Sequence, residues 1–200
     1  MSDEIALTRA TYEAIAPQYA RGGLQFAEQS DDVGWLLGEI GVGAAVAEIG
    51  CGPGDQLRAL RDVGMRAIGF DLSPAQLRAG GLSGGAAPVA VADMRALPIR
   101  TAAVDGIWCQ AALLHVPHAF VPGVLAEFCR VARHGGALLV SVAEGDGEGW
   151  QLGRFDRPRW FTGHREDGLR SLLDAAGFEV VYARHTTTHR DWLTLRAMRR

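Results

Sequence analysis

The chain has 200 residues, a length that suits one globular domain and allows a sizeable hydrophobic core. Its net charge of −3 gives no reason to expect nucleic acid as a partner. Three widely spaced Cys residues form neither a disulfide framework nor a CxxC motif, so we expect no metal site. Without a secretory leader or an apolar stretch of membrane-spanning length, we expect a cytoplasmic protein that does not contact the membrane.

Short apolar runs alternate with segments of helical periodicity along nearly the whole chain. We expect helices at residues 8–19, 31–40, 55–63, 74–80, 118–132 and 166–176. We expect strands at residues 45–50, 66–71, 88–92, 104–109, 137–143, 178–184 and 192–198. Continuous apolar strands that alternate with helices are typical of a parallel sheet covered on both faces.

The last two predicted strands are separated only by residues 185–191. Parallel neighbours need a crossover of about a dozen residues or more, so this pair should form an antiparallel hairpin at the edge of the sheet. The predicted fold class is therefore α/β: a Rossmann-like, seven-stranded, mostly parallel sheet with an antiparallel last strand and helices on both faces. Because no linker divides the chain, we expect one domain over residues 1–200.

The first predicted strand ends in a glycine loop, Gly50–Gly54, which leads into a helix. Glycines allow the backbone to approach a ligand closely, and this turn is where nucleotides and their relatives bind in open α/β sheets. Asp71 ends the second strand, where its carboxylate can accept hydrogen bonds from two ribose hydroxyls. A dinucleotide motif would have glycine at position 55, but Asp55 stands there. That carboxylate, like Glu48 in the strand, suits a ligand with an ammonium group better than a pyrophosphate.

The order of these motifs resembles that of class I S-adenosylmethionine-dependent methyltransferases, closest to the small bacterial enzymes called type 11. The similar segments are Val46–Gly54, Gly69–Pro74, Ala92–Pro98, Ala112–Val116, Arg130–Leu138 and Leu172–Val180. Together they span about residues 45–182. The resemblance implies a methyltransferase whose cofactor is S-adenosyl-L-methionine, with N-terminal lid helices in residues 1–40 and a cofactor-binding core in residues 41–200.

The resemblance also implies which residues bind the methionine part of the cofactor. Glu48, Gly50 and Gly52 would line it, with Cys51 in the same loop. Gln110, at the carboxyl end of the fourth strand, would lie beside it.

For the rest of the cofactor, the resemblance assigns five more residues. Asp71 would hold the ribose hydroxyls and Leu72 would pack on the adenine. Asp93, with Met94, would bind the adenine amino group. Tyr19 in the lid helix would approach the cofactor carboxylate.

His115 is the candidate catalytic residue, because it follows the fourth strand at the rim where a substrate should meet the methyl group. Methyl transfer is an in-line displacement at an activated carbon, so alignment supplies much of the catalysis. A general base is needed only when the nucleophile must lose a proton. His115 is either that base or a structural residue of the loop. His118 should lie near the start of the next helix, and an HxxH pair alone is weak support for a metal.

Residues 144–163 form the longest interruption between predicted elements. They carry aromatic and arginine side chains, namely Trp150, Arg154, Phe155, Arg157, Arg159, Trp160 and Phe161. These residues either enclose a planar or anionic substrate or form a covering flap. His185, His189 and Arg190 are expected in a solvated turn of the terminal hairpin.

The residues after the fourth strand, Gln110–Leu113, lack the Asn/Asp-Pro-Pro-aromatic motif of enzymes that methylate amines in nucleic acid, and no Pro-Cys pair is present there. A small-molecule substrate is therefore expected. The predicted function is methyl transfer from S-adenosylmethionine to O, N or C of a small metabolite. The alternatives are a non-catalytic module that binds the cofactor and a nicotinamide-dependent oxidoreductase.

Overall fold

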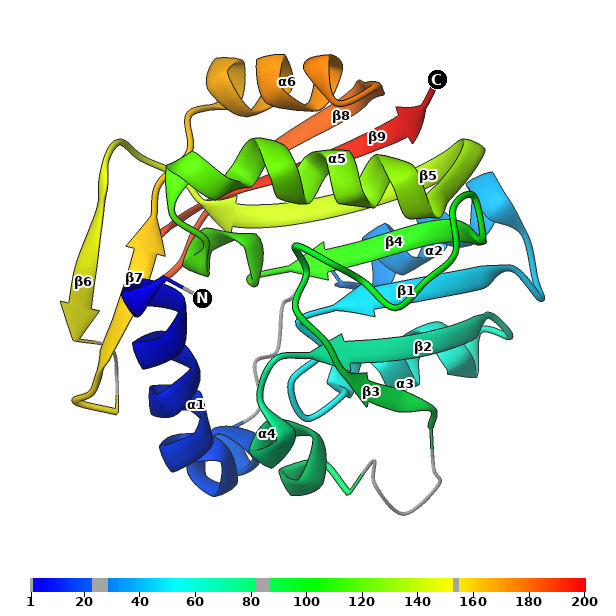
Figure 1. Cartoon of the computed structure of the whole chain (residues 1–200). Helices are drawn as coiled ribbons and strands as arrows, with labels where there is room; N and C mark the ends of the chain where they lie inside the picture. The colour runs from blue at the N-terminus through cyan, green and yellow to red at the C-terminus, as the bar shows by residue number, and fades with distance from the viewer. Residues whose placement is uncertain (1, 23–28, 82–86, 153–154) are drawn as a thin grey trace.

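A seven-stranded sheet with the order β3-β2-β1-β4-β5-β9-β8 forms the centre of the molecule (Figure 1). The computed structural model describes residues 2–22, 29–81, 87–152 and 155–200. The strands are β1 (Ala45–Ile49), β2 (Arg66–Asp71), β3 (Val89–Val91), β4 (Val104–Gln110), β5 (Ala132–Ala143), β8 (Phe178–Thr187) and β9 (Asp191–Arg199). The first five pair in parallel, whereas β9 pairs antiparallel with β5 and with β8. The predicted mostly parallel sheet with an antiparallel last strand is confirmed.

The terminal hairpin lies at the edge of the sheet, with β9 inserted between β5 and the edge strand β8. Ala143 at the end of β5 pairs with Trp192 at the start of β9. The turn that joins β8 to β9 therefore lies at the carboxyl ends of the parallel strands. This is the edge of the sheet at which ligands bind in open α/β folds.

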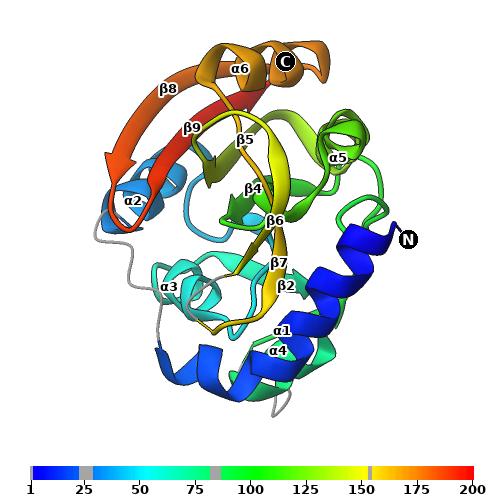
Figure 2. The same cartoon turned by 90° about the vertical axis from the view of Figure 1, so that its left-hand side faces the viewer.

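The described residues contain six α-helices. They are α1 (Asp3–Gly22), α2 (Gln29–Ile40), α3 (Asp55–Asp62), α4 (Pro74–Ala79), α5 (Val121–Val131) and α6 (Glu166–Ala175). Helices α2 and α3 cover one face of the sheet and α5 and α6 the other, as predicted, whereas α1 lies across the carboxyl ends of the strands (Figure 1 and Figure 2). Successive side chains of a strand point to opposite faces. Accordingly Leu138 packs in the cluster under α5 and α6, and Leu139 packs in the cluster under α2 and α3. Both leucines are fully buried.

The helix predicted at residues 118–132 differs from the prediction at both ends. Residues His118–Phe120 form a short 3-10 helix, and α5 begins only at Val121 with Pro122 in its first turn. A proline there lacks the N–H that a helix interior needs, so it suits a helix start. At the other end β5 begins directly after α5, at Ala132, instead of at residue 137.

Within the interruption predicted at residues 144–163, two segments pair as a two-stranded ribbon. It consists of β6 (Glu148–Leu152) and β7 (Pro158–Thr162), which pair antiparallel. Figure 2 shows this ribbon crossing the carboxyl ends of the strands, with α1 beside it. The strands were not predicted because β6 has no buried face, and Trp150 and Leu152 are both exposed.

Candidate active site

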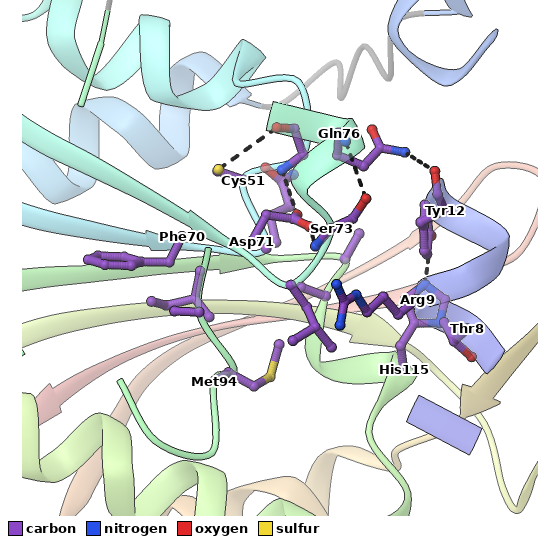
Figure 3. A pocket seen from close by; sticks show the side chains of 18 of the residues that line it. Thr8, Arg9, Tyr12, Cys51, Phe70, Asp71, Ser73, Gln76, Met94 and His115 are labelled. Carbon is purple, nitrogen blue, oxygen red and sulfur yellow. Dashed lines mark hydrogen bonds between the residues drawn. The ribbon is translucent and has the colours of Figure 1, made fainter. Parts of the chain in front are cut away.

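A cavity opens at the carboxyl ends of β1, β2 and β4, between the sheet and α1 (Figure 3). The cavity is open to solvent on one side, and the space within it and its mouth is about 1130 Å³. The predicted site residues that line it are Tyr19, Gly50, Cys51, Gly52, Asp71, Leu72, Asp93, Met94, Gln110 and His115. The fold thus brings ten of the eleven predicted site residues to one cavity. The exception is Glu48.

The glycine loop requires glycine on steric grounds. Gly50 has φ 74°, and an added Cβ would lie 2.3 Å from the Cβ of Ala112. Gly52 has φ 51°, but the nearest atoms to an added Cβ lie 4.0 Å away. Gly50 therefore permits the close contact between β1 and the segment after β4. Gly52 leaves its backbone open toward the cavity, as a loop that binds a ligand through main-chain groups needs.

The carboxylate of Asp71 is held in place at the end of β2. Its Oδ2 accepts a hydrogen bond from the N–H of Gly52 and its Oδ1 accepts one from the N–H of Ser73, both at 2.8 Å. Burial raises the pKa of Asp71, although the two N–H groups act in the opposite direction. Each oxygen still has a lone pair for a further donor. Asp71 can therefore receive hydroxyl groups of a ligand in a fixed orientation.

Asp93 and Met94 reach the cavity directly after β3. The guanidinium of Arg95 binds both oxygens of Asp93, with the shorter contact at 2.6 Å from Oδ2. Burial opposes ionisation of Asp93, but the hydrogen bonds from Arg95 outweigh it and lower the pKa of the carboxyl. Asp93 is thus a charged and oriented acceptor at this side of the cavity.

Glu48 lies inside β1, behind the glycine loop, and does not line the cavity. Its side chain is 2% exposed, and its Oε2 has no hydrogen-bond partner among the described residues. Burial raises the pKa of Glu48 well above its usual range, and the charges of Asp71 and Asp55 raise it further. A buried acid without a partner is costly unless a donor approaches it. The ammonium and sulfonium charges of S-adenosylmethionine fit this acidic surrounding and the open backbone at Gly52.

His115 lines the cavity in the short 3-10 helix Leu113–His115. Its Nδ1 lies 2.5 Å from the carbonyl oxygen of Trp160, which can only accept, so Nδ1 carries the proton. Its Nε2 then accepts a hydrogen bond of 2.8 Å from the hydroxyl of Tyr12, shown as a dashed line in Figure 3. Burial lowers the pKa of His115 to about 3. A neutral imidazole with both nitrogens occupied favours the structural alternative for this residue.

Helix α1 closes the cavity by binding both β7 and α4. The Oγ1 of Thr8 accepts a 2.9 Å hydrogen bond from the N–H of Trp160, and the hydroxyl of Thr11 donates to the carbonyl oxygen of Pro158. The side-chain amide of Gln76 donates to the carbonyl oxygen of Tyr12. Helix α2, in contrast, packs against the sheet through side chains such as Leu36.

The structure places Tyr12 and Arg190 near the cavity, although neither was predicted as a site residue, whereas His185 stays exposed as expected. Tyr12 was missed, although it lies two helical turns before Tyr19 and therefore on the same face of α1. Their rings are 5.5 Å apart. Arg190 was expected in solvent but is half-buried, with its guanidinium carbon 4.1 Å from the ring centroid of Phe161. His185 lies in β8, where it binds Glu144 and Glu166.

For the aromatic and arginine residues of 144–163, the sequence left two alternatives: they enclose a substrate or they form a covering flap. The structure supports each alternative for some of these residues. Phe155 lies 6.0 Å from the ring of Tyr19, and Phe161 is buried beside His115 at 4.8 Å. Trp150 is exposed on the outer strand. Arg154 lies outside the described residues. The ribbon thus has an exposed outer side, and its inner side chains contact Tyr19 and His115, two residues that line the cavity.

Known proteins resemble the chain along most of its length. A family model described as a methyltransferase domain matches residues 47–140. The malonyl-[acyl-carrier protein] O-methyltransferase of Serratia marcescens is 31% identical over 195 residues, which cover 92% of this chain and 75% of that protein. An uncharacterized methyltransferase of Mycolicibacterium paratuberculosis is also 31% identical, and the match covers 89% of this chain and 66% of that protein.

The fold is similar to that of a solved enzyme with bound ligands. The 1,6-didemethyltoxoflavin-N1-methyltransferase of Burkholderia thailandensis, crystallised with bound 1,6-didemethyltoxoflavin and S-adenosylhomocysteine, aligns with a TM-score of 0.78. The alignment covers 100% of this chain and 91% of that one at 20% identity, which is a likeness of fold. Together with the sequence relatives and the acidic glycine-loop cavity, this shows that the chain belongs to the class I S-adenosylmethionine-dependent methyltransferases.

Proposed function

We propose that the methyl acceptor of this enzyme is a small molecule, methylated at O, N or C. The observation that supports this most is the cavity in which the glycine loop faces the same space as Tyr12 and His115. Helix α1, which carries Tyr12, is held to β7 by the hydrogen bonds of Thr8 and Thr11. The net charge of −3 also disfavours a nucleic acid acceptor.

The roles of the individual residues form part of the proposal. Gly52 would bind the amino-acid part of the cofactor, with the buried acid Glu48 behind it in β1, and Asp71 would bind the ribose. The remaining contacts would come from Tyr19, Gly50, Cys51, Leu72, Asp93, Met94 and Gln110. When bound, S-adenosylmethionine supplies a methyl group made electrophilic by its positive sulfur. The protein then has to exclude water and align the acceptor.

We propose that His115 positions the acceptor side of the site as a neutral residue. Its imidazole joins α1 to β7 through Tyr12 and the carbonyl oxygen of Trp160. A base with a pKa of about 3 removes a proton poorly near neutral pH. An acceptor that is already a nucleophile, without losing a proton, suits this site best.

Binding and turnover test the proposal separately. Calorimetric titration of the purified chain should show binding of S-adenosylhomocysteine and none of NAD. Release of S-adenosylhomocysteine should then rise with members of a small-molecule library and stay at background with tRNA, DNA and a protein mixture. Preference for NAD would favour the oxidoreductase, and cofactor binding without turnover on any acceptor would favour the non-catalytic module.

A single domain over residues 1–200, with residues 1–40 covering a core of residues 41–200, stays a prediction, as does a cytoplasmic location. Within the described ranges no helix is long and apolar enough to cross a membrane. Limited proteolysis of the chain, with and without S-adenosylhomocysteine, tests the domain prediction. One resistant fragment that includes α1 when ligand is present is expected.

A further inference from the structure

Two arginine side chains from distant parts of the chain meet on one aromatic ring beside the cavity. Arg159 comes from β7 and Arg190 from the turn between β8 and β9. Their guanidinium carbons lie 5.2 Å and 4.1 Å from the ring centroid of Phe161. Both side chains are half-buried. Burial and the charge of Arg159 both lower the pKa of Arg190, so the two cations repel each other in a partly desolvated place.

Neither of these arginines forms an ion pair with a carboxylate within residues 2–22, 29–81, 87–152 and 155–200. Two other partly buried arginines of the sheet behave differently, because Arg184 and Arg196 both bind the buried carboxylate of Asp32 at 2.6 Å and 2.7 Å. Removing cations from water without a counter-charge is unfavourable. The pair at Phe161 therefore carries a positive charge that an anion would balance.

The guanidinium groups also have unused donors. Arg159 donates from one terminal nitrogen to the hydroxyl of Tyr12 at 3.0 Å, while its Nε is buried without a hydrogen-bond partner among the described residues. The guanidinium of Arg190 contacts the rings of Phe161 and Trp192. Among the described residues it donates no hydrogen bond. Guanidinium groups present planar sets of N–H donors that match the two oxygens of a carboxylate.

The position of the pair connects it to the acceptor side of the cavity. Tyr12, which receives the hydrogen bond from Arg159, lines the cavity and donates to His115. Tyr12 thus separates Arg159 from the cavity, and Arg190 is connected to the same side of it through Phe161, whose ring lies 4.8 Å from that of His115. An anionic group bound by the pair would place the rest of its molecule against Tyr12 and His115.

We propose that Arg159 and Arg190 form an anion subsite that binds a carboxylate group of the methyl acceptor. This rests on the proposed small-molecule function and specifies its substrate class as organic carboxylates. A carboxylate fits better than a phosphate monoester, because Asp55, Asp71 and Asp93 line the adjoining cavity and repel a dianion more than a monoanion.

Pairs of carboxylic acids and their primary amides test the proposal, for example benzoate with benzamide and hexanoate with hexanamide. The thermal midpoint and calorimetric titrations of the S-adenosylhomocysteine complex would be measured with each compound up to millimolar concentration. We expect acids to bind and to raise the midpoint, and the matching amides to have at least tenfold weaker affinity. Equal affinity of acid and amide, tighter binding of a phosphate monoester, or no binding of any acid would overturn the proposal.

Substitutions link the effect to the two residues. Arg159→Gln, Arg190→Gln and the double variant should each weaken acid binding at least tenfold, while affinity for S-adenosylhomocysteine stays within about twofold. The exposed Arg100→Gln is the matched control and should change neither. Arg190→Gln should not lower the thermal midpoint of the free protein, because it removes a repelling charge; a merely structural arginine would lower it. Retained acid binding in the double variant would refute the subsite, whereas loss of S-adenosylhomocysteine binding in the unsubstituted protein would instead refute the proposed function.

Discussion

The two sides of the cavity are built in different ways. The loop wall, residues 50–54 and 71–73, is made mostly of backbone groups that lie close in sequence. The N–H of Gly52, for example, donates a hydrogen bond to the carboxylate of Asp71, only 19 residues away in the sequence. The helix wall consists of Tyr12 and His115, and β7 holds it from behind through hydrogen bonds. It is made of side chains, and its contacts join residues 103 to 152 positions apart.

This difference matters for specificity. A backbone wall is insensitive to most substitutions but needs glycine at defined positions, so it preserves the binding of one cofactor. A wall of side chains from separate elements can change its chemistry residue by residue while the fold stays the same. We therefore expect the loop wall to respond to changes of shape and the helix wall to changes of charge and hydrogen bonding.

The largest effect is expected for Gly50→Ala in the loop wall. The left-handed φ and the clash with Ala112 should together lower the free energy of unfolding by about 2–5 kcal/mol. Binding of S-adenosylhomocysteine should be lost with it. Urea unfolding and calorimetry measure both.

Gly43→Ala is the control for strain alone, because Gly43 has φ 79° but no atom within 4 Å of an added Cβ. It should cost about 1 kcal/mol and leave ligand affinity unchanged. An equal decrease in the free energy of unfolding for Gly50→Ala and Gly43→Ala would show that the contact with Ala112 is unimportant.

The helix wall should make stability depend on pH. In the unfolded chain His115 takes up a proton below about pH 6.5, whereas in the folded protein its pKa is about 3. The unfolded state therefore binds more protons between these values, and stability is complete above pH 6.5 and falls as the pH decreases toward 3. Between pH 7 and pH 5 the loss should be about 2 kcal/mol.

The variant His115→Gln lacks this titration, so its unfolding free energy should fall less over the same range. His164 is a second buried histidine whose pKa burial lowers, to about 4, and His164→Gln is the comparison for its share. Parallel pH profiles of the unsubstituted protein and His115→Gln would contradict the burial of a neutral imidazole.

Asp71→Asn tests the charged acceptor of the loop wall. We expect affinity for S-adenosylhomocysteine to fall about tenfold, or about 1.5 kcal/mol, because a charged hydrogen-bond acceptor is lost. Calorimetric titration measures the change. Asp62→Asn, at an exposed carboxylate of α3, is the control and should bind normally. Unchanged affinity in Asp71→Asn would remove the proposed ribose contact.

The smallest effect is expected at the contact between α1 and β7. Thr8→Val leaves the N–H of Trp160 without its acceptor and should cost about 1 kcal/mol. Hydrogen exchange at Trp160 should become faster. Thr8→Ser keeps the hydroxyl and should exchange as the unsubstituted protein does; slow exchange in both variants would mean that α1 is held by other contacts.

Short-range patterns in the sequence determined the parallel sheet, the glycine loop and the arrival of Asp71 and Asp93 after the next two strands. They were readable because backbone sterics and strand burial depend on a few neighbouring residues. They also revealed the terminal hairpin, since residues 185–191 cannot form a crossover. That the carboxyl of Glu48 is buried without a hydrogen-bond partner among the described residues could not be predicted in this way, because the burial of a side chain depends on the whole core.

The tertiary structure alone decided the helix wall. No local pattern indicates that Tyr12 meets His115, that Arg159 and Arg190 meet on Phe161, or that residues 148–162 pair as a ribbon. These contacts form because the strands place their carboxyl ends at one edge and α1 is bound across it. The cofactor side follows from local backbone rules. The acceptor side follows from side chains that only the complete fold brings together.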